Sequence, residues 1–111
     1  MKWQEQQDIF NMMISEEKDL LDRKGREYAA DADALANFRS KLDIGVSPLQ
    51  VAMIFLDKHM SSIKSYVRVG HEISDESIEG RIHDARNYLA LIYMLISEKK
   101  KTESIKSDGV Q

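Results

Sequence analysis

The stretch from Ser47 to Gly70 decides the fold and reads SPLQVAMIFLDKHMSSIKSYVRVG. Ser47 carries a hydroxyl that caps helices, and Pro48 suits the first helical position, where an amide hydrogen would be unpaired anyway. Apolar residues then recur every three or four positions, at Leu49, Ala52, Met53, Leu56, Met60, Ile63 and Val67. This spacing is typical of a helix, so we predict one over residues 48–68, with Gly70 just past its end.

The segment before it shows the same period. A first helix is expected over residues 3–24, with a stripe of apolar residues at Trp3, Phe10, Met13, Ile14, Leu20 and Leu21. Gly25 is expected to end or weaken this helix, because glycine is a poor helix former. The residues that follow are polar and mixed, and within them ALANFRSKL (34–42) can form a short helix of its own.

A third helix is expected to begin after Ser74, where Asp75 and Glu76 would meet the positive end of the helix dipole. Its apolar positions are Ile78, Ile82, Ala85, Leu89, Ile92 and Ile96. It is expected to end at the lysine run 99–101, with residues 102–111 forming a polar, disordered tail. Residues 88–96 are apolar on all sides, which indicates burial on more than one side.

The fold class predicted is therefore all-α, with three main helices, a functional loop after the first, and a single domain over residues 1–101. Three helices of about 30 Å make a thin core for a chain of 111 residues. The apolar surface of the third helix is too large for two neighbouring helices to bury. We expect homo-oligomerisation to complete a helical bundle.

The composition excludes several classes of protein. The chain is 42% hydrophobic and 32% charged, has no cysteine, and contains no apolar run near the roughly 18 residues of a membrane span. Its N-terminus is polar and lacks a signal-peptide core, so a cytoplasmic location is expected. The net charge of −3 argues against polymeric nucleic acid as a partner, but a few cations in a pocket can still bind a small anion.

Charged and polar side chains interrupt the apolar stripes. Glu17 and Lys24 lie on or beside the buried face of the first helix, and Lys58, His59 and Ser62 do so on the second. On the third helix, Arg81 and Asp84 share one flank and Glu79 lies on another. These residues either form surface ion pairs or line a site. Asp84 precedes a buried run, so its carboxylate needs a partner.

The segment KGREYAADADALANF (24–38) is the other unusual feature. Its tyrosine and phenylalanine can stack on a base, and its lysine and arginine can meet phosphate. Asp31 and Asp33 either hold a divalent cation or act as turn residues. From these residues alone, a functional and a structural role for the loop stay equally open.

Together these segments resemble a known family. KGREYAADADALANF, LDKHMSSI (56–63) and ESIEGRIHDARNYLALIYML (76–95) are similar, in that order, to motifs of the small phage "nucleotide modification associated domain 1" proteins. The resemblance spans about residues 17–96 and implies a nucleotide ligand. The side chains it implies for binding are Lys24, Arg26, Tyr28, Asn37, Phe38, Lys58, His59, Ser62, Arg81 and Asn87.

The last helix also looks like that of MazG-like all-α nucleoside triphosphate pyrophosphatases. That resemblance implies a Mg²⁺ site formed by Glu17 (or Glu16) with Glu79 and Asp84, in which the metal neutralises phosphate charge and orients a water. The sequence departs from the pattern at Arg81, three residues before Asp84, and at Leu20, three after Glu17, where acidic residues are expected. This departure weakens catalysis more than binding.

Three functions follow from these observations. The first is a phage-type nucleotide-binding protein of nucleotide metabolism or modification, with Mg²⁺-dependent pyrophosphohydrolysis as its enzymatic form. The second is a non-enzymatic sponge that sequesters a cyclic nucleotide or cyclic oligonucleotide signal of host antiviral defence. The third is a helical interaction protein that binds no ligand.

Overall fold

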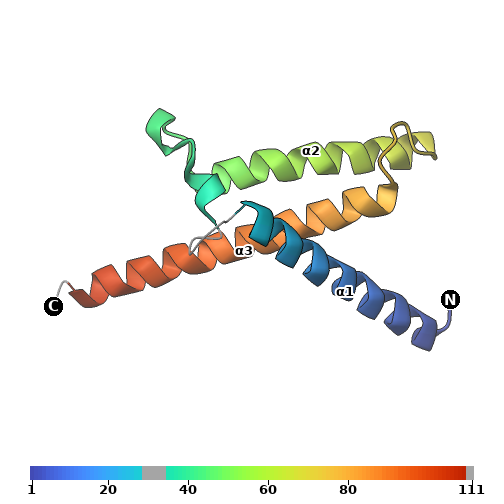
Figure 1. The fold of residues 1–111 in the computed structure, drawn as a ribbon, viewed down its shortest axis with the longest axis horizontal. Coiled ribbons are helices and arrows are strands. Elements are labelled where there is room, and N and C mark those ends of the chain that lie inside the picture. Colours follow the sequence, from blue (N-terminus) through green and yellow to red (C-terminus); the bar gives the residue numbers. More distant parts are fainter. Residues whose placement is uncertain (29–34, 110–111) are drawn as a thin grey trace. The chain divides into compact units, whose positions relative to one another are not determined.

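The computed structural model describes the backbone of residues 1–28 and 35–109 and the side chains of residues 1–24 and 35–105. Its elements are α1 (Trp3–Tyr28), η1 (Ala36–Arg39), η2 (Leu42–Ile44), α2 (Pro48–Val69) and α3 (Ile78–Gly109), where η denotes a 3-10 helix (Figure 1). No strand occurs in this part of the chain, so the all-α prediction is confirmed. The chain divides into two compact units, Met1–Ala34 and Leu35–Gln111.

Both ends of α2 lie where the sequence places them. The Ser47 hydroxyl accepts a hydrogen bond from the Gln50 amide at 3.2 Å, and the Gln50 side chain accepts one from the Ser47 amide at 2.8 Å. This reciprocal capping box satisfies two amides that have no partner inside the helix. Gly70 ends the helix with a φ of 87°, a left-handed conformation that favours glycine, and its amide donates to Tyr66.

The prediction that α1 ends at Lys24 is wrong, because the helix continues through Gly25 to Tyr28. A glycine inside a helix costs only about 1 kcal/mol relative to alanine. Arg26 and Glu27, which follow Gly25, are good helix formers, so one glycine between such residues does not end the helix.

Both predicted ends of the third helix are also wrong. The helix begins at Ile78 rather than after Ser74, because Ser77 is the serine that caps it: its hydroxyl accepts a hydrogen bond from the Gly80 amide at 3.0 Å. Asp75 and Glu76 therefore lie in the preceding loop. At the other end α3 passes the lysine run and reaches Gly109, since no glycine or proline lies between Lys101 and that residue.

In the second unit, α2 and α3 pack side by side as an antiparallel hairpin (Figure 1). The core lies where η1 meets both helices and is formed by Phe38, Val51, Ala52 and Leu95. The short helix predicted over residues 34–42 appears as the two 3-10 turns, η1 and η2, and η1 inserts Phe38 into this core. An ion pair between Arg39 and Glu98 ties η1 to α3.

The hairpin covers only one side of the apolar part of α3. Leu95 is buried and Leu91 and Ile92 are partly buried, whereas Leu89 and Tyr93 are exposed. The other large exposed apolar side chains of the two helices are Met53, Ile54, Phe55, Met60, Val67, Val69, Ile82, Met94, Ile96 and Ile105. Most of this apolar surface has no covering within the hairpin.

Candidate functional site

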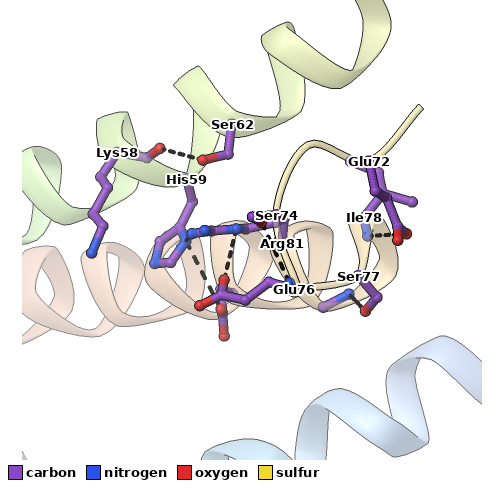
Figure 2. A network of polar contacts seen from close by, with 11 residues as sticks. Lys58, His59, Ser62, Glu72, Ser74, Glu76, Ser77, Ile78 and Arg81 are labelled. Atoms are coloured by element: carbon purple, nitrogen blue, oxygen red, sulfur yellow. Dashed lines mark hydrogen bonds and ion pairs between the residues drawn. The ribbon is translucent and has the colours of Figure 1, made fainter. Parts of the chain in front are cut away.

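Polar side chains from both helices of the hairpin meet near the loop that joins α2 to α3 (Figure 2). Lys58, His59 and Ser62 come from α2, and Arg81 and Asp84 come from α3. Residues three, four or seven apart share a helix face, and the antiparallel packing turns these two faces toward one another. Of the residues that the sequence predicts to bind a ligand, the structure brings Arg81 to His59 and places Ser62 and Arg81 in one pocket lining.

Arg81 is the centre of this cluster. Its Nε lies 2.7 Å from Oε2 of Glu76 in the loop, and its Nη1 lies 3.5 Å from Nδ1 of His59 (Figure 2). The Arg81 side chain is 16% exposed, whereas that of Glu76 is 61% exposed. The guanidinium is therefore held in place by packing, while its carboxylate partner reaches it from the solvent side.

His59 links the polar cluster to an aromatic one. Its Nδ1 lies 3.9 Å from Oδ2 of Asp84, a contact that is an ion pair only when the imidazole is protonated. The His59 ring stacks on Tyr88 with centroids 5.4 Å apart. Tyr88 also stacks on Phe55, at 5.6 Å, and meets Phe38 edge to face, at 6.4 Å.

An open pocket of about 240 Å³ lies beside Arg81 at this end of the hairpin. It is lined by Ser62, Ser65, Tyr66, His71, Glu72, Ile73, Ser74, Glu76, Ile78 and Arg81. Of these, the sequence predicts only Ser62 and Arg81 as site residues. Ser65 and Tyr66 continue the helical row of Ser62 and could have been found by extending it, but the loop residues carry no periodic signal.

Two hydrogen bonds hold the loop that lines the pocket, one to the start of α3 and one within the loop. Oε1 of Glu72 accepts a hydrogen bond from the Ile78 amide at 3.0 Å, and the Ser74 hydroxyl accepts one from the Glu76 amide at 3.4 Å (Figure 2). The Glu72 carboxylate thereby neutralises part of the positive charge at the helix N-terminus. These contacts place Glu76 within reach of Arg81.

Three predicted ligand residues lie away from this pocket. Phe38 is 8% exposed and packs in the core, and Asn87 is 7% exposed on α3. Asn37 is exposed on η1, which packs against the beginning of α2, whereas the pocket lies at its end. The 22 residues of α2 span about 33 Å, so this separation is large compared with a nucleotide.

The remaining predicted ligand residues belong to the first unit. Glu17 and Lys24 are partly buried on α1, which is described by itself. The side chains of Arg26 and Tyr28, together with Asp31 and Asp33, lie outside the described residues.

Two of the predicted magnesium ligands, Glu79 and Asp84, lie on different sides of α3. Glu79 and Asp84 are five positions apart, which is about 140° around a helix, so they point in different directions. Asp84 lies beside His59, whereas Glu79 is exposed. Across residues 1–24 and 35–105, no group of three or more histidine or carboxylate side chains is arranged to hold a metal ion. Magnesium stays a prediction from the resemblance alone.

No protein-family model, curated protein or solved structure matches this chain. The likeness to phage nucleotide-modification proteins therefore rests on the quoted motifs. None of the described helices contains an apolar stretch long enough to cross a membrane.

Proposed function

We propose that this chain is a small nucleotide-binding protein that holds the phosphate of its ligand at Arg81 without a metal ion. The observation that carries the proposal is that Ser62 from α2 and Arg81 from α3 line one pocket, with His59 3.5 Å from the Arg81 guanidinium. Ser62 and Arg81 lie 19 positions apart in the sequence, and the sequence predicts both as ligand-binding residues.

Arg81 suits a phosphate ligand because its side chain is already ordered. A guanidinium donates parallel hydrogen bonds to two phosphate oxygens, and packing of its stem reduces the entropy lost on binding. Lys58 is exposed one turn of α2 before Ser62, and its side chain does not line the pocket. The pocket lining also carries two carboxylates, Glu72 and Glu76, so the phosphate has to compete with carboxylate for the Arg81 guanidinium.

The size of the pocket limits how the ligand binds. Pockets for drug-sized ligands usually measure about 300–1,000 Å³, and this one is smaller, at about 240 Å³. It has room for a phosphate and part of a sugar, with the base outside. Tyr66 lines the pocket and offers an aromatic face on which a base can stack.

Binding is favoured over hydrolysis by the donor set, because Asp84 lies beside His59 and points away from Glu79. A sponge that releases its ligand intact, whether a mononucleotide or a cyclic species, requires no further catalytic group. Magnesium-dependent pyrophosphohydrolysis is the alternative, and it would show as cleaved ligand.

A thermal-shift screen tests the proposal. The panel holds nucleoside mono- and triphosphates and cyclic mono-, di- and trinucleotides, each with Mg²⁺ and with EDTA. A ligand at about 100 times its Kd should stabilise the fold by about 2.7 kcal/mol, which raises the Tm by on the order of 10 °C. The shift should persist in EDTA and disappear in Arg81→Met.

Arg68→Met is the matched control, since Arg68 is exposed in the last turn of α2 and does not line the pocket. A shift that requires Mg²⁺ and triphosphate would support the pyrophosphatase instead. If no nucleotide changes the Tm, the ligand-free interaction protein is the correct function.

A homo-oligomer is the second part of the proposal. The exposed apolar residues of α3 favour a homo-oligomer. The distribution of charge along α3 also suits a second copy of the same helix. Glu79 lies in the first turn of α3 and Lys99–Lys101 lie beyond its middle. An antiparallel pair of α3 helices would bring these opposite charges together.

A further inference from the structure

The Glu76–Arg81 ion pair occupies the place that the proposed function gives to a phosphate. Both side chains line the pocket, and Nε of Arg81 lies 2.7 Å from Oε2 of Glu76. A carboxylate and a phosphate accept the same charge-assisted hydrogen bonds from a guanidinium. Only one of them can bind this edge of Arg81 at a time.

The two partners are held very differently. Arg81 rises from α3 with its side chain 16% exposed and has a second contact, to Nδ1 of His59. Glu76 belongs to the joining loop, and its side chain is 61% exposed. Ion pairs with such an exposed partner are weak, because water and salt compete for the charge. The carboxylate can therefore leave while the guanidinium stays in place.

We propose that the Glu76 carboxylate is a built-in competitor for the ligand's phosphate, so that binding exchanges one anion for another at Arg81. This inference rests on the proposed function and adds regulation to the same site. A dianionic phosphate with three acceptor oxygens displaces the carboxylate, whereas weaker anions and neutral nucleosides do not. Glu76 thereby makes the site selective for phosphate monoesters.

The exchange also explains why acidic residues line a pocket proposed for an anion. With Glu76 paired, Arg81 is neutralised in the free protein and is not left as an uncompensated, largely buried charge. Glu72 has a different role, because its carboxylate accepts a hydrogen bond from the Ile78 amide. Glu76 is therefore the carboxylate that must move.

The test compares Glu76→Gln with the unaltered chain in titrations with adenosine 5′-monophosphate, inorganic phosphate and adenosine. Asp75→Asn is the matched control, because it removes the same charge from the neighbouring loop residue, which does not line the pocket. Binding is followed by calorimetry and by the NMR signal of the Arg81 Nε–H group. A difference between the two phosphate probes tells a nucleotide site from a general phosphate site.

Removing the competitor should tighten binding of both phosphate probes about fivefold, the size expected for losing a weak ion pair. The affinity for adenosine should not change, and Asp75→Asn should behave like the unaltered chain. The Tm of the free Glu76→Gln protein should fall slightly or stay constant, so affinity and stability change in opposite directions or independently.

If the unaltered chain binds the phosphate probes and Glu76→Gln binds them equally or more weakly, the competitor role is wrong while the proposed function stands. A fall in affinity together with a fall in Tm would assign Glu76 a structural role. If neither protein binds any probe, both proposals fail.

Discussion

Tyr88 connects more of the hairpin than any other described aromatic residue. Its ring contacts Phe38 from η1 and both Phe55 and His59 from α2. Each such aromatic pair contributes about 0.5–1.5 kcal/mol beyond the area it buries. A single side chain on α3 therefore holds both η1 and the middle of α2, and it positions the imidazole of the candidate site.

Replacing Tyr88 should accordingly cost a large part of the stability of the hairpin. We expect Tyr88→Ala to lower the free energy of unfolding by about 3–4 kcal/mol, as for other aromatic-to-alanine changes in cores. Tyr88→Phe keeps all three ring contacts and should cost less than half as much. Urea unfolding followed by circular dichroism measures both, and equal losses in the two variants would contradict this role for the ring.

The role of Phe38 could not be predicted from its local sequence. In the sequence it stands in a polar, irregular segment, where an aromatic ring suggests a stacking surface for a base. In the structure the same ring fills the core between α2 and α3. No local pattern marks this burial, because it depends on η1 folding back onto residues far along the chain.

At the scale of elements, the capping box of α2 is expected to contribute measurably to stability. Ser47→Ala removes the hydroxyl that accepts from the Gln50 amide and should cost about 1 kcal/mol. Ser61→Ala is the control, since Ser61 is exposed in the middle of the same helix, where alanine is the better helix former. Chemical denaturation should therefore show a lower midpoint for Ser47→Ala only. Equal midpoints for the two variants would show that the cap does not contribute to stability.

The left-handed glycine at the other end of α2 gives a second measurable effect. Gly70 has a φ of 87°, and no atom lies within 4 Å of the position that an added Cβ would take. Gly70→Ala should thus cost about 1 kcal/mol from backbone strain alone. Gly70→Asn should cost less, because asparagine tolerates this conformation better. A Tm for the asparagine variant below that of the alanine variant would refute the argument.

The helix ends divide into those that the sequence predicts and those that it does not. Both ends of α2 depend on strong local signals, a serine–proline pair and a glycine, and both are confirmed. The start of α3 is ambiguous locally, because Ser74 and Ser77 are both suitable caps. The far ends of α1 and α3 lack any strong stop, and helix propensity alone carries them four and eight residues past the expected positions.

At the scale of the whole molecule, the feature that bears on assembly is an exposed apolar face of α3. Ile82, Leu89, Tyr93 and Ile96 recur at intervals of three, four or seven on α3, and all are exposed, with Tyr93 at 75%. Contiguous apolar patches of this kind usually mark an interaction site. Helix periodicity predicts which polar residues share a face of each helix. It does not predict what covers the apolar face of α3, because that depends on tertiary or quaternary contacts.

If a second copy covers this face, a charge placed in it should separate the copies. We expect Tyr93→Lys to convert an oligomer into a monomer, as measured by sedimentation equilibrium. Thr102→Lys introduces the same side chain nine residues later, on the opposite side of α3, and should leave the mass unchanged. A monomeric mass for the unaltered chain at high concentration would rule out self-association.

The ion pair between Arg39 and Glu98 joins residues 59 positions apart and so has a consequence for the order of folding. Contacts between α2 and α3 near their joining loop close a short stretch of chain and form quickly. The Arg39–Glu98 pair closes a much longer stretch, so it forms later. Interactions that form after the transition state slow unfolding and leave the folding rate nearly unchanged. Because both side chains are partly exposed, the Arg39–Glu98 pair is expected to slow unfolding only slightly and to leave the folding rate nearly unchanged.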